Sequence, residues 1–233
     1  MNDSLMQSVP GTSLDQVRVQ NDRRVGAGHV GRALTAVWAR DGHDFVLGVR
    51  ARRSTDGASI GDAPGVRREN PRDAARAAST VVLALPWAAA ETALPTLGDL
   101  SGKTVIDCMN PIARTPDGMG LAVGHTTSGA EQVANWLPGA NIVKTLNQVG
   151  AEIIADTSGF AMPPVMFMAG DDDGAKAVVA GLLTDLGFEP LDAGDLARAR
   201  LLEPYALVWI NQAILRGKGR SWAFAAVERA GTS

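Results

Sequence analysis

The sequence predicts an α/β protein: a Rossmann-type, doubly wound parallel sheet with a smaller α/β–helical C-terminal extension. Three observations predict it. The segment from Val25 to Gly31 contains the G-x-G-x-x-G spacing and runs directly into an apolar helix pattern. Short apolar strand patterns alternate with helix patterns along the chain, as in a right-handed series of βαβ units. Hydrophobic residues make up 45% of the 233 residues, which is enough to fill such a core.

The first half of the chain carries local signals for its expected elements. Gly42 ends the first helix, Asn70 caps the second, and Ser128 begins a capping box for the fourth. The continuous apolar run over 80–85 is typical of a strand buried on both faces of a parallel sheet. These signals predict helices at 30–41, 71–78, 87–94 and 129–137, strands at 44–49, 80–85, 104–108 and 141–145, and loops at 54–65 and 114–124.

The second half continues the alternation after a cluster of glycine and proline between Val149 and Pro164. Strands are expected at 165–169 and 189–193, and helices at 173–186 and 196–215, the second of them interrupted at Pro204, with helical character again around Trp222 and Phe224. We therefore expect a disordered tail over residues 1–15, a dinucleotide-binding domain over 16–150 and a smaller domain over 151–233.

The strand that should lead into the glycine turn has an unsuitable sequence. Its expected residues, Gln20 to Val25, include Asp22, Arg23 and Arg24. Burying such charges unpaired costs several kcal/mol. We therefore expect a first strand that is shifted, distorted or marginal. A compensated frameshift would explain the segment, since codons for Gln-Asn-Asp-Arg-Arg read one base later can encode Arg-Thr-Ile-Ala; resequencing the gene checks this.

Composition excludes several classes of function. The net charge of −3 argues against a nucleic-acid-binding surface. The longest apolar run, over 81–90, is too short for a membrane span and contains Pro86. The first fifteen residues lack the apolar region of a secretory signal. Cys108 is the only cysteine, which fits a reducing cytoplasm. We expect a cytoplasmic protein that binds neither nucleic acid nor membranes.

The glycine segment and the strand after it predict the cofactor. Backbone N–H groups at a helix N-terminus bind pyrophosphate, and the expected residues are Gly26, Ala27, Gly28, His29, Val30 and Gly31. NAD-binding proteins place a carboxylate about twenty residues later, whereas this chain has Arg50, with Arg53 close behind. A guanidinium binds a 2′-phosphate, so NADP(H) is favoured. The alternative is a solvated basic loop.

Two strand ends predict the nicotinamide pocket. Leu85, Pro86 and Trp87 end one strand and Asn110 follows the next, so all four are expected at the carboxyl edge of the sheet, where ligands bind. For Trp87 a packing role is at least as well supported as a binding role.

Other reactive residues have structural explanations, and no catalytic residue can be assigned. The three aspartates 171–173 precede a helix and are expected to cap it, Cys108 is expected in the core, and His43 in a turn. No metal site is expected, because the histidines lack ligand spacing. Lys144 and Asn147 allow proton transfer or amide binding, but a structural role is favoured.

Taken together, these segments resemble a known family. Val-Leu-Gly-Val-Arg50, Val-Leu-Ala-Leu-Pro86-Trp87, Asn110-Pro111, Lys144-Thr-Leu-Asn147 and Leu202-Glu203-Pro204 follow the glycine motif in order. They resemble the NADP oxidoreductases dependent on the deazaflavin coenzyme F420 and their bacterial dinucleotide-binding relatives, over residues 25–226. The family often has serine before the arginine; Val49 stands there in this chain.

The resemblance implies a function and a quaternary structure. It implies hydride transfer between NADP(H) and F420 as a small-molecule co-substrate, and a homodimer whose C-terminal helices help to close the cleft. Such a reaction needs orientation and exclusion of water more than an acid or base. The alternatives are reduction of a flavin, a quinone or a ferric chelate, and a dinucleotide-binding sensor without turnover.

Overall fold

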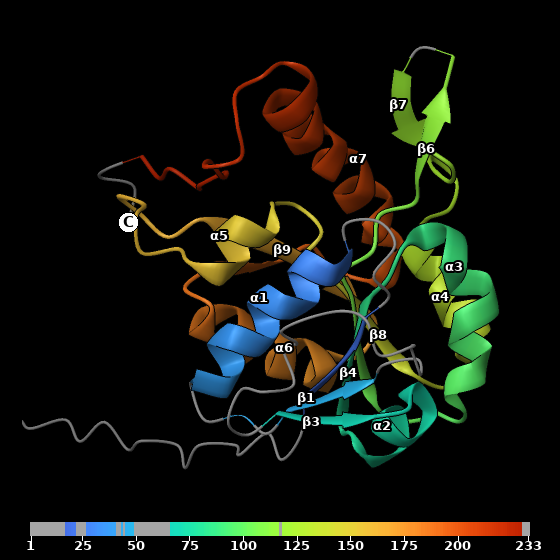
Figure 1. Ribbon diagram of the computed structural model, residues 1–233. Coiled ribbons are helices and arrows are strands. Elements are labelled where there is room, and N and C mark those ends of the chain that lie inside the picture. Colours follow the sequence, from blue (N-terminus) through green and yellow to red (C-terminus); the bar gives the residue numbers. More distant parts are fainter. Residues whose placement is uncertain are drawn as a thin grey trace, which may run out of the picture.

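One eight-stranded sheet forms the centre of the protein in the computed structural model (Figure 1). The structure describes residues 17–21, 27–40, 43, 45–48, 66–116 and 118–229. From one edge to the other the strands are β3 (Val66–Glu69), β2 (Phe45–Gly48), β1 (Val17–Asn21), β4 (Thr80–Ala84), β5 (Thr104–Asp107), β8 (Asn141–Lys144), β9 (Val165–Gly170) and β10 (Glu189–Asp192). Neighbours from β3 to β8 pair in parallel. The predicted Rossmann-type strand order is therefore confirmed.

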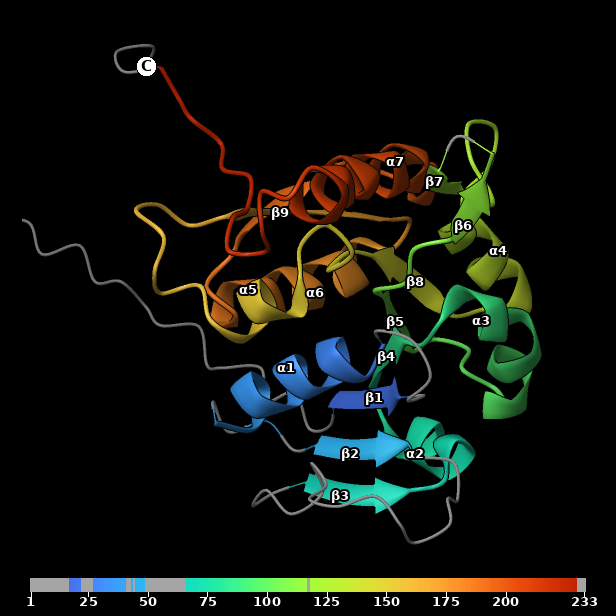
Figure 2. The same cartoon turned by 45° about the horizontal axis from the view of Figure 1, so that its top comes forward.

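Helices cover both faces of this sheet, as a doubly wound fold requires (Figure 2). They are α1 (Ala27–Arg40), α2 (Pro71–Ala77), α3 (Trp87–Ala93), α4 (Gly129–Trp136), α5 (Ala151–Ala155), α6 (Asp173–Asp185) and α7 (Ala199–Ile210), with 3-10 turns η2 (Leu94–Leu97) and η3 (Leu196–Arg198) and the π-helical turn η4 (Asn211–Leu215). In β4, Val82 and Ala84 pack with α1, α5 and α6, while Val81 and Leu83 pack with α2, α3 and α4. This two-residue alternation explains why the strand is apolar throughout.

The predicted helix starts are confirmed in detail. The Asn70 side chain accepts a hydrogen bond from the Asp73 N–H at 3.0 Å, at the start of α2. The Ser128 hydroxyl accepts from the Glu131 N–H at 3.2 Å, at the start of α4. Asp172 caps α6 through the Ala175 N–H at 2.6 Å, so the aspartate run acts as a cap.

Among the described residues no group of three metal-ligating side chains occurs.

The first strand is shifted, as its sequence led us to expect. β1 begins at Val17, three residues before the expected segment, and ends at Asn21, opposite Ala84 of β4. The strand contains the β-branched residues Val17 and Val19 together with Arg18, and residues 22–26 lie outside the described part of the chain.

Four expectations from the sequence were wrong. Helix α7 continues through Pro204 and is not interrupted there. The part of the 114–124 loop that the structure describes belongs to a hairpin of β6 (Ile112–Thr115) and β7 (Gly118–Leu121). β3 was not expected, because three of its four residues are charged; such residues suit an edge strand that faces water. The chain from Arg216 to Arg229 contains no helix; instead the Phe224 carbonyl accepts from the Val165 N–H at 2.9 Å.

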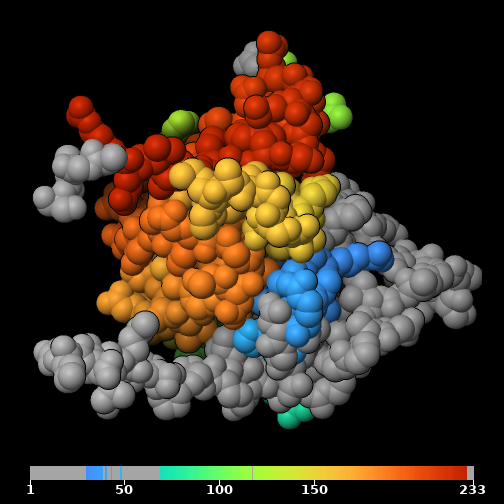
Figure 3. Space-filling model, turned by 90° about the vertical axis from the view of Figure 1, so that its left-hand side faces the viewer, coloured from blue at the N-terminus to red at the C-terminus, as the bar shows by residue number. Residues whose placement is uncertain are grey.

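The sheet continues past residue 150. β8 pairs with β9 in antiparallel orientation, so the expected boundary falls between two paired strands. One hydrophobic cluster contains Leu34 and Trp38 of α1 together with Leu182 of α6. In the space-filling view the segments around α1, α5 and α6 lie against one another (Figure 3). The division into two domains stays a prediction, and the expected tail over 1–15 lies outside the described residues.

Candidate functional site

A cleft of about 490 Å³ lies where the first turn of α1 meets the carboxyl ends of β4 and β5. The order of strands reverses at β1 and β4, which is the place where ligands bind in open α/β sheets. The lining residues come from α1, the end of β4, the start of α3, the chain after β5 and the β6–β7 hairpin: Val30, Ala84, Leu85, Pro86, Trp87, Ala88, Cys108, Met109, Asn110, Ile112 and Met119.

This cleft brings together five of the residues selected from the sequence, namely Val30, Leu85, Pro86, Trp87 and Asn110. Ala27, Gly28 and His29 form the first residues of α1, whose N-terminal N–H groups are the expected pyrophosphate site. Gly31 is buried one turn into the helix, and its carbonyl accepts from the Thr35 hydroxyl at 2.7 Å. Gly26, Arg50 and Arg53 lie outside the described residues.

The lining is apolar except for Asn110, whose amide is held in a fixed orientation. Its Nδ2 donates to the Asn147 carbonyl at 2.8 Å, and its Oδ1 accepts from Asn147 Nδ2 at 3.0 Å. Such a surface suits a flat ring that is shielded from water and oriented by few polar groups. Sequence reasoning missed Met119 because it treated 114–124 as a loop, and it missed Ile112 because no element was expected directly after Asn110-Pro111.

Trp87 both packs and lines the cleft. Its ring lies 5.4 Å from that of Trp136 in a tilted arrangement. A Cβ on Gly129 would come within 3.1 Å of this ring, so the absence of a side chain there permits the close contact. The two explanations offered for Trp87 are therefore compatible.

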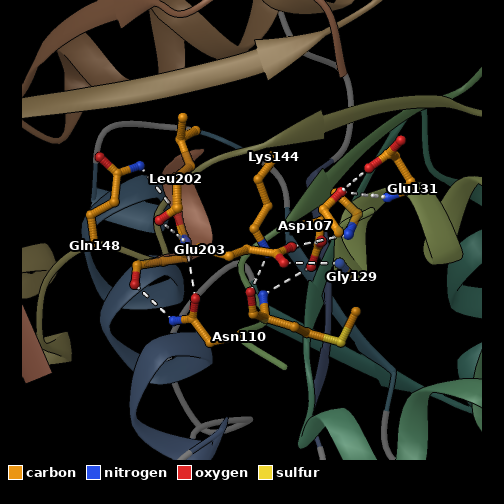
Figure 4. A network of polar contacts seen from close by, with 12 residues as sticks. Asp107, Asn110, Gly129, Glu131, Lys144, Gln148, Leu202 and Glu203 are labelled. Atoms are coloured by element: carbon orange, nitrogen blue, oxygen red, sulfur yellow. Dashed lines mark hydrogen bonds and ion pairs between the residues drawn. The ribbon is translucent and has the colours of Figure 1, made fainter. Parts of the chain in front are cut away.

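Behind the cleft lies a buried cluster of three charges, shown in Figure 4. Lys144 Nζ lies 3.0 Å from Asp107 Oδ2 and 3.4 Å from Glu203 Oε1, and donates to the Met109 carbonyl. The side chains of Lys144 and Asp107 are 0% exposed and that of Glu203 is 1% exposed. Lys144 thus has a structural role here, and sequence reasoning missed both of its carboxylate partners.

The N-terminus of α4 and the cluster stabilise each other. Glu203 Oε2 accepts from the Gly129 N–H at 2.9 Å, and Oε1 accepts from the Ala130 N–H at 3.1 Å. Burial raises the pKa of Glu203, although Lys144 and these N–H groups oppose the shift. Burial acts against the Lys144 ammonium, but Asp107 and Glu203 outweigh it and raise its pKa. All three groups are engaged, so none is free to act on a ligand in the cleft.

Cys108 is buried in the core, as expected, beside the cleft. Burial, and secondarily the charge of Asp107, raise the pKa of its thiol above the ordinary value of 9.0. The pKa of Lys144 is likewise raised above 10.5. Above these ordinary values the unfolded chain releases protons that the folded chain retains, so stability must fall as pH rises.

We therefore expect the melting temperature to fall steadily between about pH 9 and pH 11. Thermal unfolding followed by circular dichroism in matched buffers measures the effect. In Cys108→Ala the decline should be shallower from pH 9 upward, since the thiol contribution is gone. An unchanged slope in this variant would show that the thiol does not contribute.

Comparisons with known proteins identify the family. The family described as "NADP oxidoreductase coenzyme F420-dependent" matches residues 25–111, which include the glycine segment and most of the cleft lining. A crystal structure of a candidate F420-dependent NADP reductase from Arthrobacter sp. FB24 is similar to this chain. The two proteins share 30% sequence identity with a TM-score of 0.81, and the match covers 91% of this chain and 99% of that one. The chain belongs to this family. The family is one of NADP-dependent oxidoreductases, and the chain has its Rossmann-type nucleotide-binding fold.

More distant relatives are also similar to this chain. The metalloreductase STEAP3 of Rattus norvegicus is 27% identical over 184 residues, covering 78% of this chain. This chain spans about a third (36%) of that protein. An imine reductase from Aspergillus terreus, solved with a nicotinamide cofactor, is 20% identical with a TM-score of 0.60, covering 88% of this chain and 64% of that one; it shares the fold. No helix in the described part of the chain has the length and apolar character needed to cross a bilayer.

Proposed function

We propose that the protein transfers hydride between NADP(H) and a deazaflavin of the F420 type. The observation that carries the proposal is the apolar cleft at the β1–β4 switch point, which begins at the N-terminus of α1 and has Asn110 as its polar side chain. NADP(H), when bound, supplies or accepts the hydride. The name of the Arthrobacter protein supports F420 as the co-substrate.

The chain's own residues would bind, orient and exclude water. Gly26 and the first turn of α1 would hold the pyrophosphate, and Arg50 with Arg53 the 2′-phosphate. Leu85, Pro86 and Trp87 would contact the nicotinamide side of the cleft. Asn110, held by Asn147, has a fixed amide with which to orient a polar ring substituent. Hydride transfer needs this orientation rather than a catalytic acid or base.

The acceptor is tested by following NADPH oxidation with F420, FMN, a quinone, ferric citrate or no acceptor. We expect saturable reduction of F420 above all others. Preference for ferric citrate would favour a metal-chelate reductase, a candidate raised by the similarity to the rat metalloreductase. NADPH binding without reduction of any acceptor would contradict catalysis and favour a sensor.

The choice of cofactor is tested by Arg50→Ala. Loss of a charge-assisted contact to the 2′-phosphate is expected to weaken NADPH binding by about ten- to a hundredfold, while NADH binding stays unchanged. Fluorescence titration of both nucleotides measures this. An equal loss for NADH would contradict a 2′-phosphate contact.

We further propose a cytoplasmic homodimer whose subunits meet along α7 and η4. Leu201 and Val208 of α7 and Leu215 of η4 are 62%, 50% and 55% exposed, and such apolar side chains on consecutive helical segments suit burial against a second copy. Sedimentation should show a dimer that Val208→Glu converts to a monomer. A monomeric wild-type protein would contradict the proposal.

A further inference from the structure

Two polar connections run from α7 to the wall of the cleft. Glu203 contacts Lys144, and Lys144 donates to the Met109 carbonyl. Asn147 Nδ2 donates to the carbonyl of Leu202 at 3.2 Å and also to Asn110 Oδ1. Adjacent residues of α7 are thus joined to adjacent residues of the cleft wall, each through one buried side chain (Figure 4).

A third contact joins Glu203 to α4, beside Trp87. Glu203 accepts hydrogen bonds from the first two N–H groups of α4, at Gly129 and Ala130. A Cβ added to Gly129 would lie 3.1 Å from both Glu203 Oε1 and the Trp87 ring, so both side chains pack close to this glycine. Trp87 lines the cleft, whereas α4 contributes no lining residue.

A separate ion pair already joins α7 to α4 at the surface. Arg200 Nε donates to Glu131 Oε2 at 2.9 Å, and neither residue lines the cleft. This pair attaches the same two helices without touching Met109 or Asn110. The buried connections differ from this ion pair because they contact Met109 and Asn110, the part of the cleft wall that follows β5.

We propose that Glu203, Lys144 and Asn147 are positioning residues that set the cleft wall at Met109 and Asn110 according to how α7 is docked. Lys144 links the helix and the wall through an ion pair with Glu203 and a hydrogen bond to Met109, and Asn147 links them through two hydrogen bonds, so a displacement of α7 is transmitted to both wall residues. The inference rests on the proposed function only in taking the cleft as the nicotinamide site. It adds that α7, although it contributes no lining residue, governs the shape of that site.

The test compares Glu203→Gln and Asn147→Ala with Arg200→Gln as the matched control. Glu203→Gln keeps the size of the side chain but removes the charge that Lys144 contacts. Asn147→Ala removes the second connection and leaves every charge in place, so it tests the proposal even if the first variant folds poorly. Arg200→Gln removes the surface connection between the same two helices.

Two measurements are made below the melting temperature of each variant. In the free proteins, hydrogen–deuterium exchange over residues 108–112 should be faster in Glu203→Gln and Asn147→Ala, and unchanged in Arg200→Gln. Fluorescence titration should show NADPH binding weakened about tenfold in the first two and less than about twofold in the control. If Glu203 and Asn147 only stabilised the fold, their substitution would lower the melting temperature without faster exchange over residues 108–112 and without weaker NADPH binding.

The outcomes separate the two proposals. If both buried variants match Arg200→Gln in exchange and in NADPH affinity, the positioning inference is overturned. If the wild-type protein binds no NADPH, the proposed function fails, while the exchange pattern still decides whether α7 positions the wall.

Discussion

Lys144→Met is expected to lower the free energy of unfolding by about 3–5 kcal/mol, because it leaves two carboxylates buried without a counter-ion. Asp107 and Glu203 are almost completely excluded from water, and the lysine is the cation that both contact. The methionine fills similar volume, so the loss reports charge rather than packing. Denaturant unfolding followed by circular dichroism at pH 7.5 measures it.

Lys176→Met is the matched control. Lys176 also contacts two carboxylates, at 2.8 Å in Asp192 and 3.1 Å in Asp173, but these are 46% and 97% exposed. Water can solvate them after the substitution, so we expect a loss of about 1 kcal/mol or less. Equal losses in the two variants would contradict the importance of burial.

The deficit of Lys144→Met should shrink as the pH is lowered. Burial already raises the pKa of Glu203 in the wild type, and removal of the opposing lysine raises it further. A carboxyl group whose pKa is raised on folding binds its proton more tightly in the folded state, so lowering the pH through this range restores stability. Adding Glu203→Gln to the variant should reduce this pH dependence, because the Glu203 carboxyl no longer titrates.

Trp38→Ala is expected to destabilise the protein by about 3–5 kcal/mol. The side chain of Trp38, a residue of α1, is fully buried, and its Nε1 donates to the Leu182 carbonyl of α6 at 3.3 Å. This contact joins residues that lie before and after the expected domain boundary at residue 150. We therefore expect calorimetry to show a single unfolding transition, whose melting temperature is lowered in the variant.

Trp38→Phe serves as the control, since it keeps an aromatic ring in the core while it removes the hydrogen bond and part of the indole volume. Its loss should be smaller than that of the alanine variant. Two transitions, of which only one responds to the substitution, would show that the chain has independent domains. They would support the division at residue 150.

Local chemistry allowed most of the elements to be predicted. The cap at Asn70, the capping box at Ser128 and the continuous apolar run of β4 each depend on residues close in sequence, so their structure follows from the sequence. β3 and the β6–β7 hairpin were missed because they are short and stabilised by pairing with a neighbouring strand; β3 is also charged, and β7 contains two glycines.

For the candidate site, the sequence by itself determined the glycine segment and two wall segments, because consecutive parallel strands end at one edge of a sheet. Only the tertiary structure brought Glu203 to Gly129, 74 residues earlier in the chain, and placed Lys144 between Glu203 and Asp107. No local pattern encodes these contacts. They depend on α7 crossing the carboxyl ends of β5 and β8, where burial makes each charge require its partner.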